Sequence, residues 1–160
     1  MAHYQSSLLG NARKIVTRDS HAARIVKVGI AYFALVFGAG FVLGSIRVPI
    51  LVPRVGERIA ELIETPFMFV VVVMAARFIV RRYALPTHTF IRLGVGVVAL
   101  GMLLIAECLL AVGIQGKPIG EYIASRDPIS GTVFLVMLVL FALMPLILGR
   151  VQLARERHVA

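Results

Sequence analysis

Four long apolar segments limit what this sequence can fold into. They lie at about residues 28–46, 63–80, 93–114 and 130–149. Each reaches or approaches the roughly 20 residues that a helix needs to cross a hydrocarbon layer of about 30 Å. The sequence therefore predicts an all-α fold, an integral membrane four-helix bundle.

The composition agrees with a membrane protein and not with an ordinary soluble domain. Hydrophobic residues make up 59% of the chain, the mean hydropathy is +0.92, and only 16% of residues are charged, whereas soluble domains have about 25% charged residues. The chain has 17 Lys and Arg against 8 Asp and Glu, which in a soluble protein would suggest nucleic-acid binding. In a membrane protein the excess is instead a topology signal. We therefore expect the lipid bilayer, and no nucleic acid, as a partner.

Two proline pairs mark expected helix starts. Thr65-Pro66 and Asp127-Pro128 each fit an N-cap followed by proline at the first helical position. A second span from Pro66 to Val80 would be only about 22 Å long, so it is expected to use part of residues 57–65. That segment is either continuous with the second helix and bent at the proline, or a separate short interfacial helix before helix two.

Basic residues are distributed unevenly between the two sides of the predicted bundle. Eleven flank the ends that carry the termini and the middle loop: Arg13, Lys14, Arg18, Arg24, Lys27, Arg81, Arg82, Arg92, Arg150, Arg155 and Arg157. Five flank the opposite ends: Arg47, Arg54, Arg58, Lys117 and Arg126. The positive-inside rule then predicts that both termini are cytoplasmic, the N-in/C-in topology.

This topology divides the chain into three parts. Residues 1–26 form a basic cytoplasmic N-terminal segment, residues 27–150 the four-span transmembrane domain, and residues 151–160 a basic cytoplasmic tail. The N-terminal segment is too long and too polar for a usual secretory signal, so the first span is expected to be an uncleaved anchor. Its composition fits a mitochondrial transit peptide as well as a basic arm on anionic headgroups, and both interpretations stay open.

Charged residues from distant parts of the sequence are expected to meet at the external face. They are Arg47, Glu57, Glu61, Glu64, Glu121, Arg126 and Asp127. At 100° per residue, the three glutamates of residues 57–64 fall within about 60° of one another on one helix face. Glu107 joins this group from within the third span, about 10 Å below that surface.

Glu107 is the most informative of these residues. A carboxylate at that depth costs a few kcal/mol unless it is paired, protonated or hydrated. Arg47, or an arginine of the first external loop, is the expected partner. Three roles remain open: a pair that locks helices together, a substrate, ion or proton site, and a contact with a partner subunit. Arg77, at the other end of its span, is expected to extend to the headgroups with Arg81 and Arg82.

Small residues and a proline predict how the helices pack. Gly40 and Gly44 form a GxxxG motif in the first span, and Gly94 and Gly101 reduce the width of the third. They predict a tight contact between these two helices, or a homodimer face, because small residues let backbones approach closely in lipid. Pro145 should kink the fourth helix and free the carbonyl four residues earlier.

Familiar catalytic and cofactor chemistry lacks residues here. The histidines, His3, His21, His88 and His158, all lie outside the predicted spans, which removes paired haem ligands. Cys108 is the single cysteine, which removes disulfides, thiolate zinc sites and iron–sulfur clusters. No HExxH, P-loop, GxSxG or GxGxxG motif is present. We therefore expect no metal, no cofactor and no catalytic residues, although an enzyme acting on a membrane lipid or quinone stays open.

Residues 40–69, GFVLGSIRVPILVPRVGERIAELIETPFMF, resemble a known family. The matching features are Gly40, Leu43-Gly44, Arg47, Pro53, Gly56, Ala60-Glu61-Leu62, Glu64 and Pro66, with a weaker match at residues 122–128. The segment is similar to a family of small uncharacterised four-span bacterial inner-membrane proteins. The resemblance implies a four-helix fold and a multi-pass protein of the bacterial cytoplasmic membrane, and it implies no activity.

The sequence thus favours a non-enzymatic subunit or scaffold with a polar cluster at its external face, in a homo-oligomer or a larger membrane complex. The alternative is a small proton-coupled transporter or ion pathway that uses Glu107.

Overall fold

The computed structural model describes residues 2–86, 88–115 and 128–159, and among them the side chains of residues 21–86, 88–110 and 128–151. This part of the chain is helical and contains no strand. Its elements are α1 (Ala2–Ile46), the π-helix η1 (Arg47–Leu51), α2 (Val52–Val55), α3 (Glu57–Arg82), α4 (Thr89–Gln115) and α6 (Pro128–Val159).

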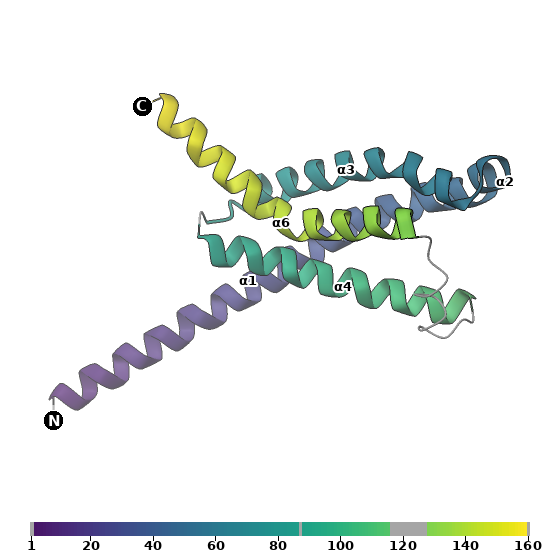
Figure 1. Cartoon of the computed structure of the whole chain (residues 1–160). Coiled ribbons are helices and arrows are strands. Elements are labelled where there is room, and N and C mark those ends of the chain that lie inside the picture. The colour runs from purple at the N-terminus through teal and green to yellow at the C-terminus, as the bar shows by residue number, and fades with distance from the viewer. Residues whose placement is uncertain (1, 87, 116–127, 160) are drawn as a thin grey trace.

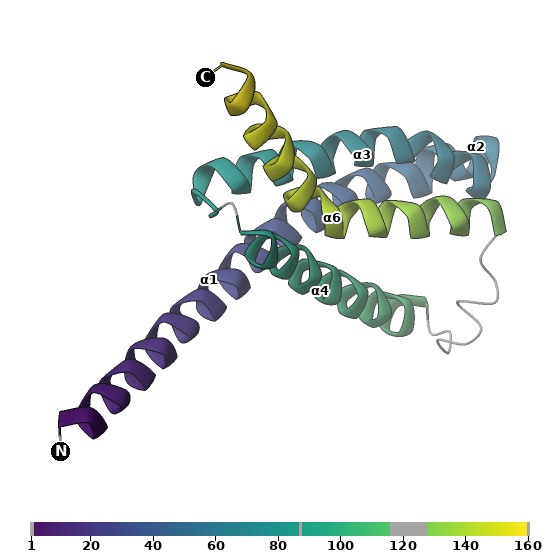
Figure 2. The same cartoon turned by 60° about the vertical axis from the view of Figure 1, so that its left-hand side comes forward.

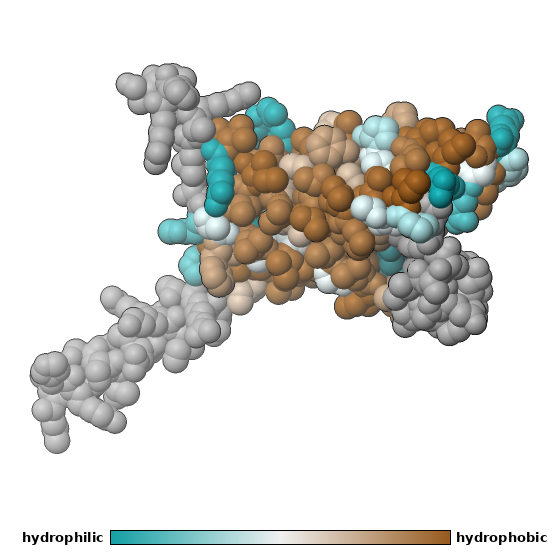
Figure 3. Space-filling model, viewed as in Figure 1, coloured by the Kyte–Doolittle hydropathy of each residue, from teal (hydrophilic) through white to brown (hydrophobic). Residues whose placement is uncertain are grey.

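Four of these helices are long and apolar enough to cross a membrane. The candidate spans are His21–Ile50, Glu57–Arg82, Thr89–Leu110 and Pro128–Val151. Figure 3 shows apolar residues over the middle of the bundle and polar residues toward its two ends. The predicted all-α bundle of four spanning helices is confirmed, and it fits a small integral membrane protein that crosses the bilayer four times.

The bundle has two distinct ends. Residues 83–86 and 88, between α3 and α4, lie at one end, where the N-terminal part of α1 and the C-terminal part of α6 project away from the bundle (Figures 1 and 2). The short helix α2 lies at the opposite end. We call these the 83–88 end and the α2 end. Both termini therefore lie on the same side, as four crossings require.

The four long helices form a ring in which each contacts two neighbours. The neighbouring pairs are α1 with α4, α4 with α6, α6 with α3, and α3 with α1. Among the described residues, no Cα atom of α3 lies within 8 Å of one in α4, and the same holds for α1 and α6. The helices α3 and α4, although consecutive in sequence, are therefore diagonal, and the connection between them crosses the end of the bundle.

Two arginines fix this diagonal connection. Arg24 of α1 donates from Nη2 to the carbonyls of residues 83 and 84, at 2.6 and 3.1 Å. Arg92 of α4 donates from Nε to the carbonyl of residue 86 at 2.9 Å and from Nη2 to that of residue 85 at 3.1 Å. These four carbonyls follow the end of α3, and a positive charge near the C-terminal end of a helix is favourable. Both arginines thus hold the connection that follows α3 against α1 and α4.

The buried core lies mostly in the half of the bundle next to the 83–88 end. The long helices contribute to it Val28, Tyr32, Val36, Val72, Ala75, Ala76, Ile79, Val80, Ile91, Val95, Ala99, Phe141, Ala142 and Met144. In the half next to the α2 end, the described side chains that are buried are those of Ala60 and Ser130. The two halves therefore differ in how tightly their helices pack.

A hydrogen bond joins α1 to α6 across the diagonal of the ring. Pro145 lies inside α6, and because proline has no N–H, the carbonyl of Phe141 loses its usual donor. The hydroxyl of Tyr32 donates to this carbonyl at 3.1 Å, and the rings of Tyr32 and Phe141 stack with their centroids 4.6 Å apart. The carbonyl that the sequence predicts to be freed thus receives a donor from another helix.

Glycines allow three close helix contacts. A Cβ atom at Gly29 of α1 would lie 2.8 Å from Val98 of α4, and one at Gly94 would lie 3.2 Å from Ile25 of α1. A Cβ atom at Gly96 would overlap a backbone carbonyl oxygen of α6. Such contacts depend on the absence of a side chain.

The glycines expected to pack the first and third spans are placed differently. Gly94 contacts α1 as described, but Gly40 faces α3, because a Cβ atom at Gly40 would lie 3.3 Å from Cε of Met68. A Cβ atom at Gly44 or Gly101 would meet no described atom within 4 Å. The contact between α1 and α4 therefore lies nearer the 83–88 end than the GxxxG motif suggests.

The start of α3 corrects one expectation and confirms another. The prediction that Thr65 caps a helix starting at Pro66 is wrong, because α3 begins at Glu57 and continues through the proline. Of the two alternatives for residues 57–65, the helix continuous with the second span is confirmed, and the separate interfacial helix is wrong. The break before α3 comes from Gly56, whose φ of 80° is readily adopted only by glycine. The fourth helix is helical from Pro128 onward, and its expected cap, Asp127, lies outside the described residues.

Candidate functional site

The candidate site is built on the turn between α1 and α3. The π-helix η1 follows α1 directly, and the backbone N–H of Val52 bonds to the carbonyl of Arg47, as the wider π turn requires. Pro49 within this turn lacks an N–H. The turn, the short α2 and Gly56 together reverse the chain, so that the first residue of η1, Arg47, lies beside α3.

Arg47 forms ion pairs with two carboxylates of α3. Its Nη1 atom lies 3.3 Å from Oε1 of Glu61, and its Nε atom lies 3.0 Å from Oε2 of Glu64. Residues three apart in a helix share one face, so one guanidinium reaches both. We call these three residues the Arg47 cluster. It joins the end of α1 to the first turns of α3.

The electrostatics of the Arg47 cluster follow from its partial burial. The three side chains are 17–29% exposed, so their charges interact more strongly than surface charges do. The Nε contact is close enough for attraction between the charges but is not aligned as a hydrogen bond. The cluster contains two carboxylates and one guanidinium, and it therefore carries one net negative charge. Without Arg47, the two carboxylates would repel each other.

Other residues expected in the external polar cluster have varied positions. Glu57 is exposed, one turn before Glu61. Glu121, Arg126 and Asp127 lie outside the described residues. The structure therefore brings together three members of the expected set and leaves Glu57 at the rim.

Glu107 lies deeper in the bundle than the Arg47 cluster. It is half-buried on α4, inside a candidate span. The contacts of Gly94 with Ile25 and of Gly29 with Val98 set α1 and α4 parallel, with an offset of about 69 residues. Glu107 is then level with residue 38, about 13 Å along the axis from Arg47. The guanidinium expected to pair with Glu107 instead contacts the two carboxylates of α3.

The chemistry that these groups support is limited. Among the residues that the structure describes, no group of three or more His, Cys, Asp or Glu side chains could hold a metal ion. The charges of the Arg47 cluster are engaged with each other and hold two helix ends together. Glu107 is a carboxylate within a span, and intramembrane carboxylates can bind and release protons.

Sequence reasoning missed the roles of three residues. Arg24 and Arg92 were counted only as topology charges, although both donate to the carbonyls of residues 83–86. Tyr32 was treated as part of an apolar run. A tyrosine hydroxyl buried in a span needs an acceptor, and the carbonyl freed by Pro145 was a candidate. The sequence shows the donor and the acceptor of this hydrogen bond, but it does not show that the two helices face each other.

Comparison of the chain with families of known proteins, with curated proteins and with solved structures found no match. The functional interpretation therefore depends on the geometry of the residues described above.

Proposed function

We propose that this chain is a small multi-pass protein of the bacterial cytoplasmic membrane, with both termini in the cytoplasm, that acts as a non-enzymatic subunit or scaffold. The four apolar helices support membrane insertion. The distribution of basic residues supports the orientation. The similarity of residues 40–69 to a bacterial inner-membrane family supports the location.

The observation that supports the scaffold role is that Arg47 forms ion pairs within the chain. Both of its carboxylate partners belong to this chain, on α3. A polar cluster engaged in this way orders the turn between two helices, as ion pairs in lipid commonly do when they hold a fold together. The cluster then shapes the surface at the α2 end without taking part in a reaction.

The subunit role is tested by measuring how many chains associate in the membrane. Chemical cross-linking before solubilisation, followed by native mass spectrometry in mild detergent, should give an assembly with a fixed number of chains. Arg47→Gln should lower the thermal stability of that assembly. A wild-type protein that stays a single chain both in the membrane and in mild detergent would contradict the subunit role.

A second function, a proton or ion pathway, is favoured by the position of Glu107. This carboxylate is half-buried within a candidate span, in the half of the bundle where the described residues form little buried core. Loose packing around an intramembrane acid admits water, and water lets the acid exchange protons.

Glu107→Gln separates the two functions because it keeps the shape of the side chain and removes its charge. Wild-type protein and variant are reconstituted into vesicles that contain a pH-sensitive dye, and a proton gradient is imposed. The scaffold role predicts no flux above empty vesicles for either protein. Wild-type flux that disappears in a normally folded Glu107→Gln protein would establish the pathway and remove the scaffold role.

The proposed orientation has its own test. In a Cys108→Ser background, Val55→Cys at the α2 end and Thr89→Cys at the 83–88 end are treated with a membrane-impermeant maleimide in intact cells. We expect labelling of the first variant only. Labelling of the second variant alone would show that the orientation in the membrane is the opposite of the proposed one.

A further inference from the structure

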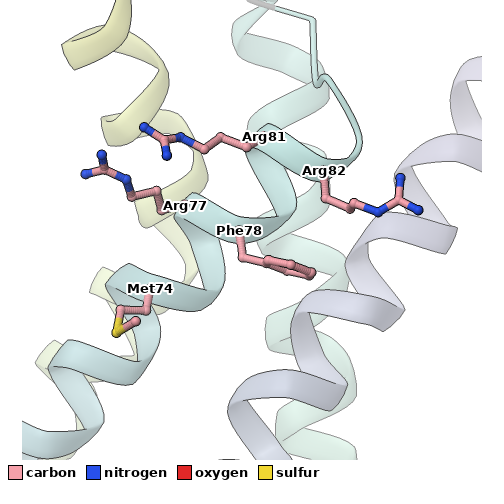
Figure 4. Close-up of a pocket in the computed structure, with 5 residues that line it drawn as sticks. All are labelled: Met74, Arg77, Phe78, Arg81 and Arg82. Atoms are coloured by element: carbon pink, nitrogen blue, oxygen red, sulfur yellow. The ribbon is translucent and has the colours of Figure 1, made fainter.

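An open pocket of about 450 Å³ lies on α3 near the 83–88 end, far from the Arg47 cluster. It is lined by Met74, Arg77, Phe78, Arg81 and Arg82 (Figure 4). All five residues belong to the last turns of one helix, which is a candidate span. The pocket therefore faces the level at which this span leaves the hydrocarbon layer.

Within the part of the protein whose side chains are described, the three arginines of the pocket form no ion pair. Each is exposed, and among the side chains that the structure describes, no carboxylate pairs with any of them. Arg24 and Arg92, at the same end of the bundle, differ because both donate to backbone carbonyls. Three neighbouring cations without an internal partner repel each other, and an external anion would remove that repulsion.

The pocket begins along the helix with an apolar residue and ends with two arginines, and Arg77 and Phe78 lie between them. Met74 is 66% exposed and Phe78 is 54% exposed, and Met74 precedes the first arginine. From Arg77 to Arg82 the helix rises about 7.5 Å, which is close to the depth of the headgroup region on one side of a bilayer. An apolar side chain at acyl-chain level, Met74, with guanidiniums toward headgroup level matches one amphipathic ligand.

We propose that this pocket binds an anionic phospholipid. A headgroup phosphate lies between Arg77 and Arg81, which are one turn apart and extend to the same side of α3 in Figure 4, and arginine suits phosphate oxygens through its fork of donors. An acyl chain lies along Met74. The site is independent of the proposed subunit role and of the orientation in the membrane.

The direction of Arg82 determines which phospholipid binds most tightly. Its side chain extends to the other side of α3, toward α1, together with Phe78 (Figure 4). A lipid with one phosphate occupies the Arg77 and Arg81 side only. A lipid with two phosphates and four acyl chains, such as cardiolipin, reaches both sides, so it is expected to bind more tightly than phosphatidylglycerol.

Lipid titration of the full chain in neutral detergent tests this site, with bound lipid measured by native mass spectrometry. We expect binding of cardiolipin and phosphatidylglycerol but not of zwitterionic phosphatidylcholine. The double variant Arg77→Gln, Arg81→Gln should weaken phosphatidylglycerol binding by about fivefold for each arginine. The matching double lysine variant keeps the charges but loses the fork of donors, so it should bind phosphatidylglycerol more weakly than the wild type and more tightly than the double glutamine variant. Arg82→Gln alone should reduce the preference for cardiolipin and leave phosphatidylglycerol binding unchanged.

The controls decide whether the pocket is specific. Arg54→Gln removes an exposed arginine of α2 at the opposite end and should leave lipid binding unchanged. Equal weakening by this control, or unchanged binding in a folded double glutamine variant, would overturn the proposal. Inorganic phosphate that raises the melting temperature as much as phosphatidylglycerol does would show a free-anion site instead, and would also overturn it.

Discussion

Tyr32→Phe removes one oxygen atom and keeps the aromatic ring. The lost hydroxyl donates to the carbonyl of Phe141 at 3.1 Å, and the ring stack at 4.6 Å remains. Tyr32 is 0% exposed, so water does not replace the missing donor. Pro145 has no N–H to offer the same carbonyl. The substitution therefore leaves a buried acceptor without its donor.

The expected loss of stability follows from two ranges of hydrogen-bond energies. A buried acceptor left unsatisfied costs about 1–3 kcal/mol in soluble proteins, whereas side-chain hydrogen bonds measured in a membrane protein average about 0.6 kcal/mol and reach about 1.7 kcal/mol. Because proline removes the helix's own donor to the Phe141 carbonyl, the upper part of the membrane range applies. We expect Tyr32→Phe to lower the free energy of unfolding by about 1–1.5 kcal/mol.

A double-mutant cycle isolates the cause. Pro145→Ala restores an N–H four residues after Phe141, so the same Tyr32→Phe change should then cost about 0.5 kcal/mol or less. Unfolding is followed by circular dichroism in mixed micelles of increasing SDS content. As a control, Tyr83→Phe removes a hydroxyl with no hydrogen bond among the described residues and should cost under about 0.5 kcal/mol. An equal cost of Tyr32→Phe with proline and with alanine at position 145 would refute the reasoning.

Three further substitutions test other parts of the bundle by the same unfolding assay or by proteolysis. Arg47→Gln leaves two half-buried carboxylates facing each other. It should lower the free energy of unfolding by about 2 kcal/mol, less than the 3–5 kcal/mol lost when a fully buried pair is broken. An unchanged midpoint of the unfolding curve would contradict the role of the cluster. Gly96→Ala should cost about 3 kcal/mol because its Cβ atom would overlap the backbone of α6, whereas Gly101→Ala, with open space around it, should cost nothing. Arg24→Gln removes two hydrogen bonds to the connection and should speed protease cleavage within residues 83–86; an unchanged rate would show that the connection holds without them.

Hydropathy predicted the four spans correctly because lipid tolerates few alternatives to a long apolar helix. Proline is favoured at the first position of a helix, and α6 is helical from Pro128 onward. The same rule failed at Pro66, where the helix continues through the proline. Proline is tolerated inside membrane helices, and the nearby Gly56, with its positive φ, supplied the break.

The polar contacts were harder to predict because they depend on which helices are neighbours. The sequence places Arg47, Glu61 and Glu64 in one expected cluster, but the pairing of Arg47 with these two residues follows from the turn at η1, a π-helix that no sequence pattern indicated. Similarly, Gly40 and Gly44 form the familiar motif, yet the closest approach to α4 occurs at Gly29. A GxxxG motif allows two helices to pack closely, but the order of the helices around the ring determines which helix the glycines contact.

The diagonal placement of α3 and α4 has a consequence for synthesis of the protein. Helices enter a membrane in the order in which the ribosome makes them, and a consecutive hairpin often packs at once. Here no described Cα atom of α3 lies within 8 Å of one in α4, so each of the two newly inserted helices first packs against α1. The last helix, α6, fits between them and completes the ring, and a nascent chain stalled before Pro128 would leave one side of both helices facing lipid.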